Sequence, residues 1–243
     1  MNRYRYSIKS GNKVLGVIPA RGGSKSIPKK NISKLNGKPL IFYTIEQAKK
    51  SSLLDKFIVS TDSKEIASIA KNYNVEVPFL RPKELSKDDT GSVDVVLHAL
   101  NFMEKKDNTQ YDFVVLLQPT NPLRSFALID EAINIIKNNN IDSVVSIVDV
   151  GANHPHRMYS LNSKNQLKPF VKNLKNQMMP RQKLPSIYIR SGDIYVIKKN
   201  ILIKKKSLIG DNTYGFVVDA NETVNIDEKV DLDIARLKLK NFY

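Results

Sequence analysis

The chain has 243 residues, and its 39 Lys and Arg against 24 Asp and Glu give a formal net charge of +15. It contains no Cys, which excludes disulfide bonds, cysteine-ligated metal centres and a thiol nucleophile, and which fits a reducing compartment such as the cytoplasm. The longest apolar runs, such as residues 113–117, are too short to cross a bilayer, so we expect no membrane partner.

Strand-like apolar runs alternate with helical patterns along the chain. The runs predict β-strands at 14–19, 56–60, 75–80, 112–117, 143–148, 193–197 and 214–218. Apolar residues at helical spacing predict helices at 39–51, 62–73, 91–105, 126–138 and 227–240. Short strands that alternate with helices are typical of βαβ units, so the sequence predicts an α/β fold with a mostly parallel sheet covered by helices on both faces.

Two regions interrupt this alternation. Residues 1–13 are basic and lack the apolar segment of a signal peptide, which predicts a flexible tail before a single domain at 14–243. Between 151 and 190 the periodicity fails and Pro, Asn and Lys predominate. We interpret this second region as an arm inserted into the domain.

The positive charge is concentrated in two segments. No acidic residue precedes Glu46, and a second acid-free segment covers residues 151–192. Two local anion-binding sites explain this distribution better than a general surface for polyanions. A basic nucleic-acid-binding protein is the alternative; it predicts basic residues interleaved with aromatic ones, and the second segment has only Tyr159, Phe170 and Tyr188.

The loop at 20–31, ARGGSKSIPKKN, follows the first predicted strand. In open parallel sheets, ligands bind at the carboxyl ends of the strands. The two glycines let the backbone approach a phosphate closely, and Arg21, Lys25, Lys29 and Lys30 supply cations. The spacing fits neither a Walker A loop nor G-x-G-x-x-G. The loop's position after a strand favours a phosphate site over an ordinary basic loop.

Polar residues near the starts of two predicted helices can act as helix caps. Asp62 or Ser63 can cap the helix that follows the second strand, and helix capping is the interpretation that we favour for Asp62. Ser92 can cap the next helix or present its hydroxyl to the edge of a nucleobase.

Gln118 follows the buried strand at 112–117, and Pro119 and Pro122 make the following turn rigid. A glutamine held in this way suits hydrogen bonding to a polyhydroxylated or amide ligand. The alternative is a turn that only requires prolines.

An acidic cluster near the end of the chain predicts a metal site. If residues 225–227 end a strand, Asn225 and Asp227 lie on one face, and their oxygens suit Mg²⁺ or Mn²⁺. Asp231 and Asp233 fit the first turn of the last helix, where the helix dipole favours acidic residues. His154 and His156 would need a distant carboxylate as a third ligand, so we do not expect them to bind zinc.

Taken together, the motifs resemble the acylneuraminate cytidylyltransferases, also called CMP-sialic acid synthetases, which include enzymes for legionaminic acid. The matching segments occur in the family's order and cover the chain from about residue 14 to its end; they are IPARGGSKSIPKKN (18–31), NGKPL (36–40), IVSTD (58–62), FLRPKEL (79–85), DDTGSVDVVLHAL (88–100), LLQPTNPLR (116–124), MPRQKLP (179–185), SGDIYVI (191–197) and NIDEKVDLD (225–233).

The resemblance implies a Rossmann-like sheet of the nucleotidyltransferase type, a homodimer formed through the arm at 151–190, and a reaction in which CTP and a nonulosonic acid give the CMP-sugar and pyrophosphate. It implies catalytic roles for Arg21, Lys30 and Asp227. The implied nucleotide-binding residues are Arg21, Gly22, Ser24, Lys25, Lys30, Asn31, Arg81 and Ser92. The implied sugar-binding residues are Gln118, Arg157, Arg181 and Tyr195, and the implied metal ligands are Asp227 and Asn225.

One position departs from the family pattern. The family commonly has D-x-D where this chain has Asn225-Ile226-Asp227. Because Asn offers only a neutral carbonyl oxygen, we expect weaker or more water-mediated metal binding in which Asp227 dominates.

The acceptor is open at this point. Another acidic sugar, such as pseudaminic acid or the eight-carbon acid of lipopolysaccharide, is the alternative to a sialic or legionaminic acid. The segments LQPTNPLR and DDTGS resemble the sialic and legionaminic branches more closely. No residue stands out as a general base for the acceptor hydroxyl.

Overall fold

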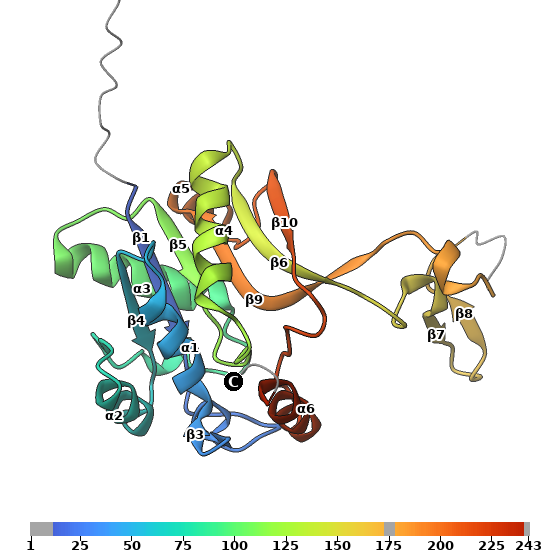
Figure 1. Ribbon diagram of the computed structural model, residues 1–243, viewed down its shortest axis with the longest axis horizontal. Helices are drawn as coiled ribbons and strands as arrows, with labels where there is room; N and C mark the ends of the chain where they lie inside the picture. The colour runs from blue at the N-terminus through green and yellow to red at the C-terminus, as the bar shows by residue number, and fades with distance from the viewer. Residues whose placement is uncertain (1–11, 173–177, 241–243) are drawn as a thin grey trace, which may run out of the picture.

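A six-stranded sheet forms the centre of the molecule (Figure 1). The structure is a computed structural model that describes residues 12–172 and 178–240. The strand order is β10-β6-β9-β5-β1-β4, and β9 runs antiparallel to both neighbours whereas the other pairings within this sheet are parallel. The prediction of a mostly parallel sheet is therefore confirmed. The strands are β1 (Val14–Pro19), β4 (Lys56–Ser60), β5 (Phe113–Leu116), β6 (Ser143–Asp149), β9 (Tyr188–Lys198) and β10 (Thr213–Val217).

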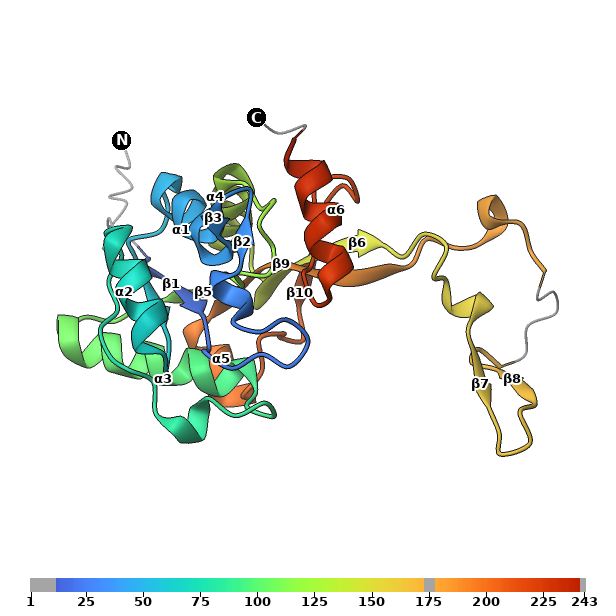
Figure 2. The same ribbon diagram turned by 90° about the horizontal axis from the view of Figure 1, so that it is seen from below.

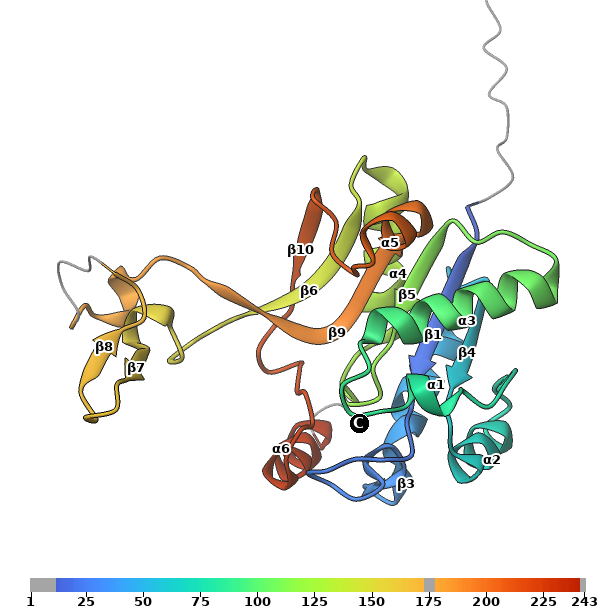
Figure 3. The same cartoon turned by 180° about the vertical axis from the view of Figure 1, so that it is seen from behind.

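Helices cover both faces of this sheet. The helices α1 (Leu40–Lys50), α2 (Lys64–Asn72) and α4 (Phe126–Asn138) pack on one face. The helices α3 (Ser92–Asp107) and α5 (Lys199–Lys205) pack on the other, which faces the reader in Figure 3. The continuous apolar sequence of β1 and β5 follows from this arrangement, because strands that are buried on both faces need apolar side chains in both directions.

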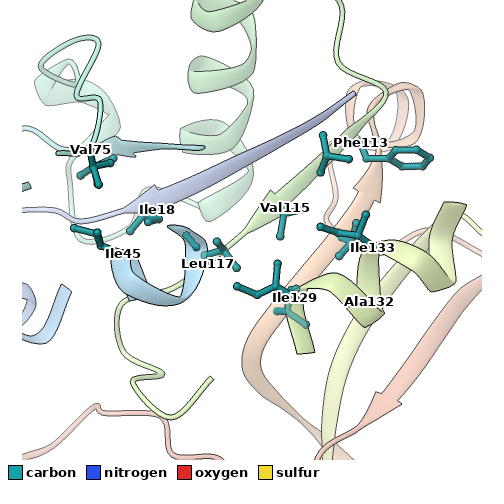
Figure 4. Close-up of a cluster of buried hydrophobic side chains, with 14 of the residues drawn as sticks. Ile18, Ile45, Val75, Phe113, Val115, Leu117, Ile129, Ala132 and Ile133 are labelled. Carbon is teal, nitrogen blue, oxygen red and sulfur yellow. The ribbon is translucent and has the colours of Figure 1, made fainter. Parts of the chain in front are cut away.

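The side chains of β1 alternate between the two cores. Val14 and Ile18 join the core under α1 and α4, and Leu15 and Val17 join the core under α3. Figure 4 shows Ile18 in the first core, together with residues of β5 and α4. The carboxyl ends of β1, β4 and β5 consequently meet at one edge of the sheet, held from both sides.

A short hairpin and the last helix close this edge. The strands β2 (Lys34–Leu35) and β3 (Lys38–Pro39) are joined by Asn36 and Gly37, whose φ angles of 47° and 79° fit the two-residue turn that favours Asn-Gly. Helix α6 (Lys229–Leu239) packs its Leu232 and Leu239 in one cluster with Leu35. This contact places the segment that precedes α6 beside the loop that follows β1.

Some elements differ from the sequence prediction. Residues 75–80 form no regular strand but only isolated bridges, Ile58 to Glu76 and Thr61 to Leu80. Pro78 lies between them and has no N–H to donate, which interrupts a ladder. Helix α5 was not predicted, and the run at 193–197 is the end of the longer strand β9.

The segment between β6 and β9 projects away from the sheet (Figure 2). It contains the hairpin of β7 (Tyr159–Leu161) and β8 (Leu167–Pro169). Leu161, Leu167 and Phe170 are 65%, 63% and 68% exposed there, although they are large and apolar. The predicted tail at 1–13 falls outside the described residues except for positions 12 and 13. Among the described helices, none combines the length and apolar character needed to cross a membrane.

Candidate active site

A pocket of about 400 Å³ opens at the carboxyl ends of β1 and β5. The loop after β1, the segment 81–92 and the turn after β5 supply most of its wall, and Asp227 completes it. We call it the loop pocket. It brings together these residues of the sequence prediction: Arg21, Ser24, Lys25, Lys30, Asn31, Arg81, Ser92, Gln118 and Asp227.

The loop after β1 is fixed by contacts to its backbone. The N–H of Gly22 donates to Asp62 Oδ1 at 2.9 Å, and the side-chain amide of Asn31 donates to the carbonyl of Arg21 at 2.9 Å. A Cβ atom on Gly22 would lie 3.0 Å from the Cβ of Ser63, so a larger residue would require a shift. Gly22 thus fixes the backbone of the loop through its N–H. It is the one predicted nucleotide-binding residue that does not line the loop pocket.

Asp62 therefore differs from its predicted role. Ser63 is the N-cap of α2, and its side chain accepts from the N–H of Ile66 at 3.3 Å. Asp62 instead holds the loop through Gly22 and lies 3.9 Å from the guanidinium group of Arg81. The capping interpretation was correct for Ser63 and wrong for Asp62.

Two cations of the loop share one carboxylate. Arg21 lies 2.7 Å and Lys25 2.8 Å from oxygens of Asp88. The hydrogen bond from Lys25, assisted by the charges of Lys25 and Arg21, holds the pKa of Asp88 below its usual value. Asp88 consequently stays ionised and neutralises the cations that the sequence assigns to phosphate. Arg21 also donates to the carbonyl of Lys87 at 3.1 Å.

Lys30 forms a comparable ion pair with Asp227, and both residues line the loop pocket. The Lys30 side chain is 12% exposed. Its ammonium group donates to the carbonyl of Ile226 at 2.8 Å and lies 3.1 Å from Asp227 Oδ1. Asn225 donates to the other oxygen of Asp227 at 2.6 Å. Asp231 accepts from the backbone N–H of Asp227 at 2.9 Å and forms a capping box with Glu228, which fixes this turn at the start of α6.

Asn225 and Asp227 supply few metal ligands by themselves. The described residues include no group of three or more His, Cys, Asp or Glu that could hold a metal ion. One carboxylate and one amide oxygen nevertheless fit Mg²⁺, which usually keeps several waters and substrate phosphates among its ligands. The Asp227 side chain is 67% exposed and faces the loop pocket, where such ligands could complete the set.

Arg81 is a buried residue that lines the loop pocket. It is 5% exposed, and its Nε donates to Ser86 Oγ at 3.2 Å. Burial lowers its pKa, the nearby Asp62 carboxylate opposes that effect, and Arg21 adds to it. A guanidinium group nevertheless stays charged in proteins. The N-cap of α3 is Gly91, so Ser92 is the first residue of the helix rather than its cap, and it lines the loop pocket.

Gln118 is held in place by a buried arginine. Arg124, which is 2% exposed, donates to the carbonyl of Gln118 at 3.1 Å and to Thr44 Oγ1 at 2.6 Å. Desolvation in this position lowers the pKa of Arg124, and the charge of Asp193 opposes the shift. The turn after β5 thus does more than accommodate prolines, because it fixes the backbone from which Gln118 projects.

A second pocket adjoins the first along β9, and we call it the β9 pocket. Gln118 and Ser92 line both pockets. Tyr195, which is 9% exposed, lies in the β9 pocket, and burial raises the pKa of its hydroxyl so that it stays protonated near neutral pH. The other lining residues are Val93, Leu116, Ile189, Arg190, Ser191, Gly192, Lys206, Ser207, Leu208, Ile209 and Asn225.

The structure does not bring Arg157 and Arg181 into either pocket. Both are exposed residues of the projecting segment, and Arg181 lies 3.9 Å from Asp149. The buried His154 uses its Nε2 toward the carbonyl of Pro185 at 3.0 Å and its Nδ1 to accept from a backbone N–H at 3.1 Å. It supports the base of the projecting segment.

Sequence reasoning missed Asp88, Arg190 and Lys206 as pocket residues. Asp88 belonged to a motif of the resemblance but received no role, although an acidic residue near a basic loop could have suggested an ion pair. Arg190 was counted only as part of an acid-free segment. No local signal identifies Lys206, because its place in the β9 pocket depends on the unpredicted helix α5.

Comparison with known proteins gives a consistent set of similarities. The sequence profile of the family described as Cytidylyltransferase matches residues 15–236. The chain is 36% identical over 221 residues to the CMP-N,N'-diacetyllegionaminic acid synthase of Legionella pneumophila, covering 90% of this chain and 93% of that protein. It is 33% identical over 229 residues to the pseudaminic acid cytidylyltransferase of Campylobacter jejuni, covering 94% and 97%.

A solved structure extends the similarity to the fold. The structure of CMP:2-keto-3-deoxy-manno-octonic acid synthetase complexed with CTP aligns with a TM-score of 0.71 at 16% identity, and the alignment covers 95% of this chain and 100% of that chain. At this identity the likeness concerns the fold alone, which is the nucleotidyltransferase type of α/β sheet.

Proposed function

Because the chain belongs to the cytidylyltransferase family, we propose that it transfers CMP from CTP to the anomeric hydroxyl group of a nonulosonic acid of the sialic or legionaminic type. The anomeric hydroxyl group loses its proton to solvent and its oxygen forms a bond to the α-phosphorus of CTP, while the bond from that phosphorus to the bridging oxygen breaks and pyrophosphate leaves. The proposal rests on the two adjoining pockets, because Gln118 and Ser92 line both of them. A nucleotide in the loop pocket and an acid in the β9 pocket would meet at these two side chains.

The loop pocket suits a triphosphate. Phosphoryl and nucleotidyl transfer depend mainly on positioning and on neutralising negative charge. Arg21, Lys25 and Lys30 line the pocket and supply that charge, once phosphate oxygens replace their present carboxylate partners. Arg81 and Ser92 would contact the nucleoside end, where the buried guanidinium offers fixed donors.

The β9 pocket suits a sugar acid. The side chain of Gln118 can hydrogen-bond hydroxyl or acylamido groups, and the Tyr195 hydroxyl remains a donor because burial raises its pKa. The apolar residues Val93, Leu208 and Ile209 in the same wall offer a surface for acyl or methyl substituents. No general base is assigned to the acceptor hydroxyl.

We also propose that Asp227, assisted by Asn225, holds Mg²⁺ or Mn²⁺ during the reaction. A divalent cation would supply positive charge beside the phosphates when bound. The support is the donor chemistry of the two side chains and the exposure of the Asp227 carboxylate toward the loop pocket. Lys30 lies 3.1 Å from one oxygen of this carboxylate, so the ammonium group and a metal ion would compete for that oxygen.

The projecting segment supports a proposal of homodimerisation. Its exposed apolar residues would gain burial against a second copy of the chain, and Arg157 and Arg181 could approach the partner's acceptor from there. A reaction that consumes CTP fits the cytoplasm, and neither a nucleic acid nor a membrane is needed as a partner. Light scattering of the purified protein should give twice the monomer mass.

The acceptor class is tested by product formation. We expect pyrophosphate to be released from CTP in a one-to-one ratio with the CMP-sugar when sialic or legionaminic acids are supplied. Pseudaminic acid and the eight-carbon acid are the control acceptors, and a much higher kcat/KM with either would change the proposed acceptor. The proposal fails if none of the acids releases pyrophosphate while the protein binds RNA tightly and in a salt-dependent way.

A further inference from the structure

We propose that Arg190 and Lys206 of the same subunit bind the carboxylate group of the acceptor in the β9 pocket. This inference rests on the proposed function, because it requires an acidic acceptor. It assigns the anion contact to two residues that the sequence resemblance does not mark, in place of Arg157 and Arg181 of the projecting segment.

The charge of the β9 pocket is the first argument. Arg190 and Lys206 are the only charged residues among the described residues that line it, and no carboxylate lies with them. Within 12–172 and 178–240, neither side chain has an ion-pair partner. A pocket with two cations and no acid lowers the free energy of an anionic group bound there.

The position of Arg190 on β9 is the second argument. In the ladder with β6, Tyr195 lies opposite Val145 and Arg190 lies opposite Ile147. Val145 and Ile147 are two residues apart, so they and their partners share one face of the sheet. Arg190 and Tyr195 are an odd number of residues apart and would face opposite ways in a regular strand.

An irregularity in the ladder resolves this conflict. The register shifts between Val145 and Ile147, and Gly192 adopts a φ of 84° in the corresponding part of β9. A bulge of this kind re-aims side chains and is often located next to active sites. Burial raises the pKa of the Tyr195 hydroxyl, and the positive charge of Arg190 opposes this increase. The irregular strand therefore places Arg190 and the buried Tyr195 in the lining of the same pocket.

The backbone of Lys206 is the third argument. It follows α5 with φ 45° and ψ 48°, a left-handed conformation that favours Gly or Asn. Of the other non-glycine residues with positive φ, Lys29 is paired with Glu65, and the remainder are Asn36, Asn74, Asn108 and Asn165. Lys206 thus occupies a position that its backbone disfavours, and its ammonium group has no ion-pair partner in the part of the chain that the structure describes.

Together the two cations suit a carboxylate. Arginine presents parallel N–H donors that match the two carboxylate oxygens, and a lysine beside it adds charge without a fixed geometry. A carboxylate held here would leave the anomeric centre near Gln118 and Ser92, which line the boundary with the loop pocket.

The test compares acceptor kinetics among matched variants. Arg190→Ala and Lys206→Gly remove the two charges, and glycine keeps the left-handed backbone at 206 without strain. Arg190→Lys retains charge but loses the bidentate geometry. Lys204→Ala removes an exposed lysine of α5 that does not line either pocket and serves as the control. We expect the acceptor KM to rise about 10- to 100-fold in Arg190→Ala and less in Lys206→Gly, with the KM for CTP unchanged.

A neutral acceptor isolates the carboxylate. Each variant is assayed with the acid and with its carboxyl methyl ester, and the same pair is applied to Arg157→Ala and Arg181→Ala. If Arg190 and Lys206 bind the carboxylate, their variants should lose kcat/KM for the acid but almost none for the ester. If Arg157→Ala or Arg181→Ala shows that pattern while Arg190→Ala does not, the assignment is wrong and the proposed function stands. If the wild-type protein uses no nonulosonic acid at all, the proposed function is wrong and this inference falls with it.

Discussion

The loop pocket and the β9 pocket present their cations in different ways. In the loop pocket, Arg21 and Lys25 are paired with Asp88, and Lys30 is paired with Asp227. In the β9 pocket, Arg190 and Lys206 have no such partners among the described residues. The pairing orients the loop cations, and a bound triphosphate would have to replace the carboxylates.

This difference suggests how two anions are kept apart. A triphosphate carries enough charge to displace Asp88 from two cations, whereas a single carboxylate gains less from such an exchange. The β9 pocket needs no exchange and therefore suits the weaker anion. The predictions below test this division, beginning with the largest expected effect.

Substitution of Asp227 should have the largest effect on activity, because its carboxylate pairs with Lys30 and is also the proposed ligand of the metal ion. We expect Asp227→Ala to lower kcat/KM by about 100-fold or more, since metal ions supply several kcal/mol of charge stabilisation in such reactions. Initial rates over a range of Mg²⁺ concentrations measure the effect. Normal activity of this variant at limiting Mg²⁺ would contradict the assignment.

Asn225→Asp is the matched variant for the same site. It adds a second carboxylate and should lower the Mg²⁺ concentration needed for half-maximal rate, because a hard cation binds more tightly to charged oxygens. An unchanged Mg²⁺ dependence would mean that Asn225 does not contact the metal ion.

Arg21→Ala should raise the KM for CTP about 10- to 100-fold, because a hydrogen bond to a charged group contributes about 1.5–3 kcal/mol. Lys29→Asn is the control in the same loop: Lys29 has a left-handed backbone that Asn tolerates, pairs with Glu65 and does not line the loop pocket. Equal effects of the two substitutions would show that the loop acts through its overall charge.

Asp88→Asn should change the KM for CTP in the opposite direction. The carboxylate competes with phosphate for Arg21 and Lys25, and exposed ion pairs contribute at most about 1 kcal/mol each, so we expect the KM to fall about two- to fivefold. Because its pKa lies below the usual value, Asp88 competes as an anion throughout the neutral range, and the variant's advantage should not depend on pH between about 6 and 8. A higher KM would show that Asp88 supports nucleotide binding.

Lys206→Gly should have the smallest effect on the folded protein. A left-handed backbone costs a non-glycine residue about 1–2 kcal/mol, and glycine loses part of that gain through the entropy of the unfolded chain. We expect the free energy of unfolding to stay the same or to rise by up to about 1 kcal/mol. Denaturant titration measures it, and a clear loss of stability would show that the Lys206 side chain packs in the fold.

The positions of the pocket loops could be predicted from the sequence, because apolar runs end where polar residues begin. The loop after β1 and Gln118 after β5 were located in this way. The role of Asp62 could not be predicted locally, because its partner Gly22 lies forty residues earlier in the chain. The strand at 75–80 was predicted wrongly because apolar spacing outweighed the interruption at Pro78.

The position of Arg190 could not be predicted from the alternation of side chains along a regular strand. A regular strand places Arg190 and Tyr195 on opposite faces, and only the irregular ladder at Gly192 brings them together. Lys206 depends in the same way on where α5 ends. Contacts made through a bulge or past a helix end require the three-dimensional backbone.

Equilibrium binding of CTP in the absence of any acceptor tests the division between the two pockets most directly. Calorimetric titration of the wild-type protein, Arg21→Ala and Arg190→Ala gives the three dissociation constants. We predict that Arg21→Ala weakens CTP binding about 10-fold or more, whereas Arg190→Ala leaves it within about twofold of wild type. Equal weakening by both substitutions would contradict the account, because it would mean that CTP occupies the two pockets together.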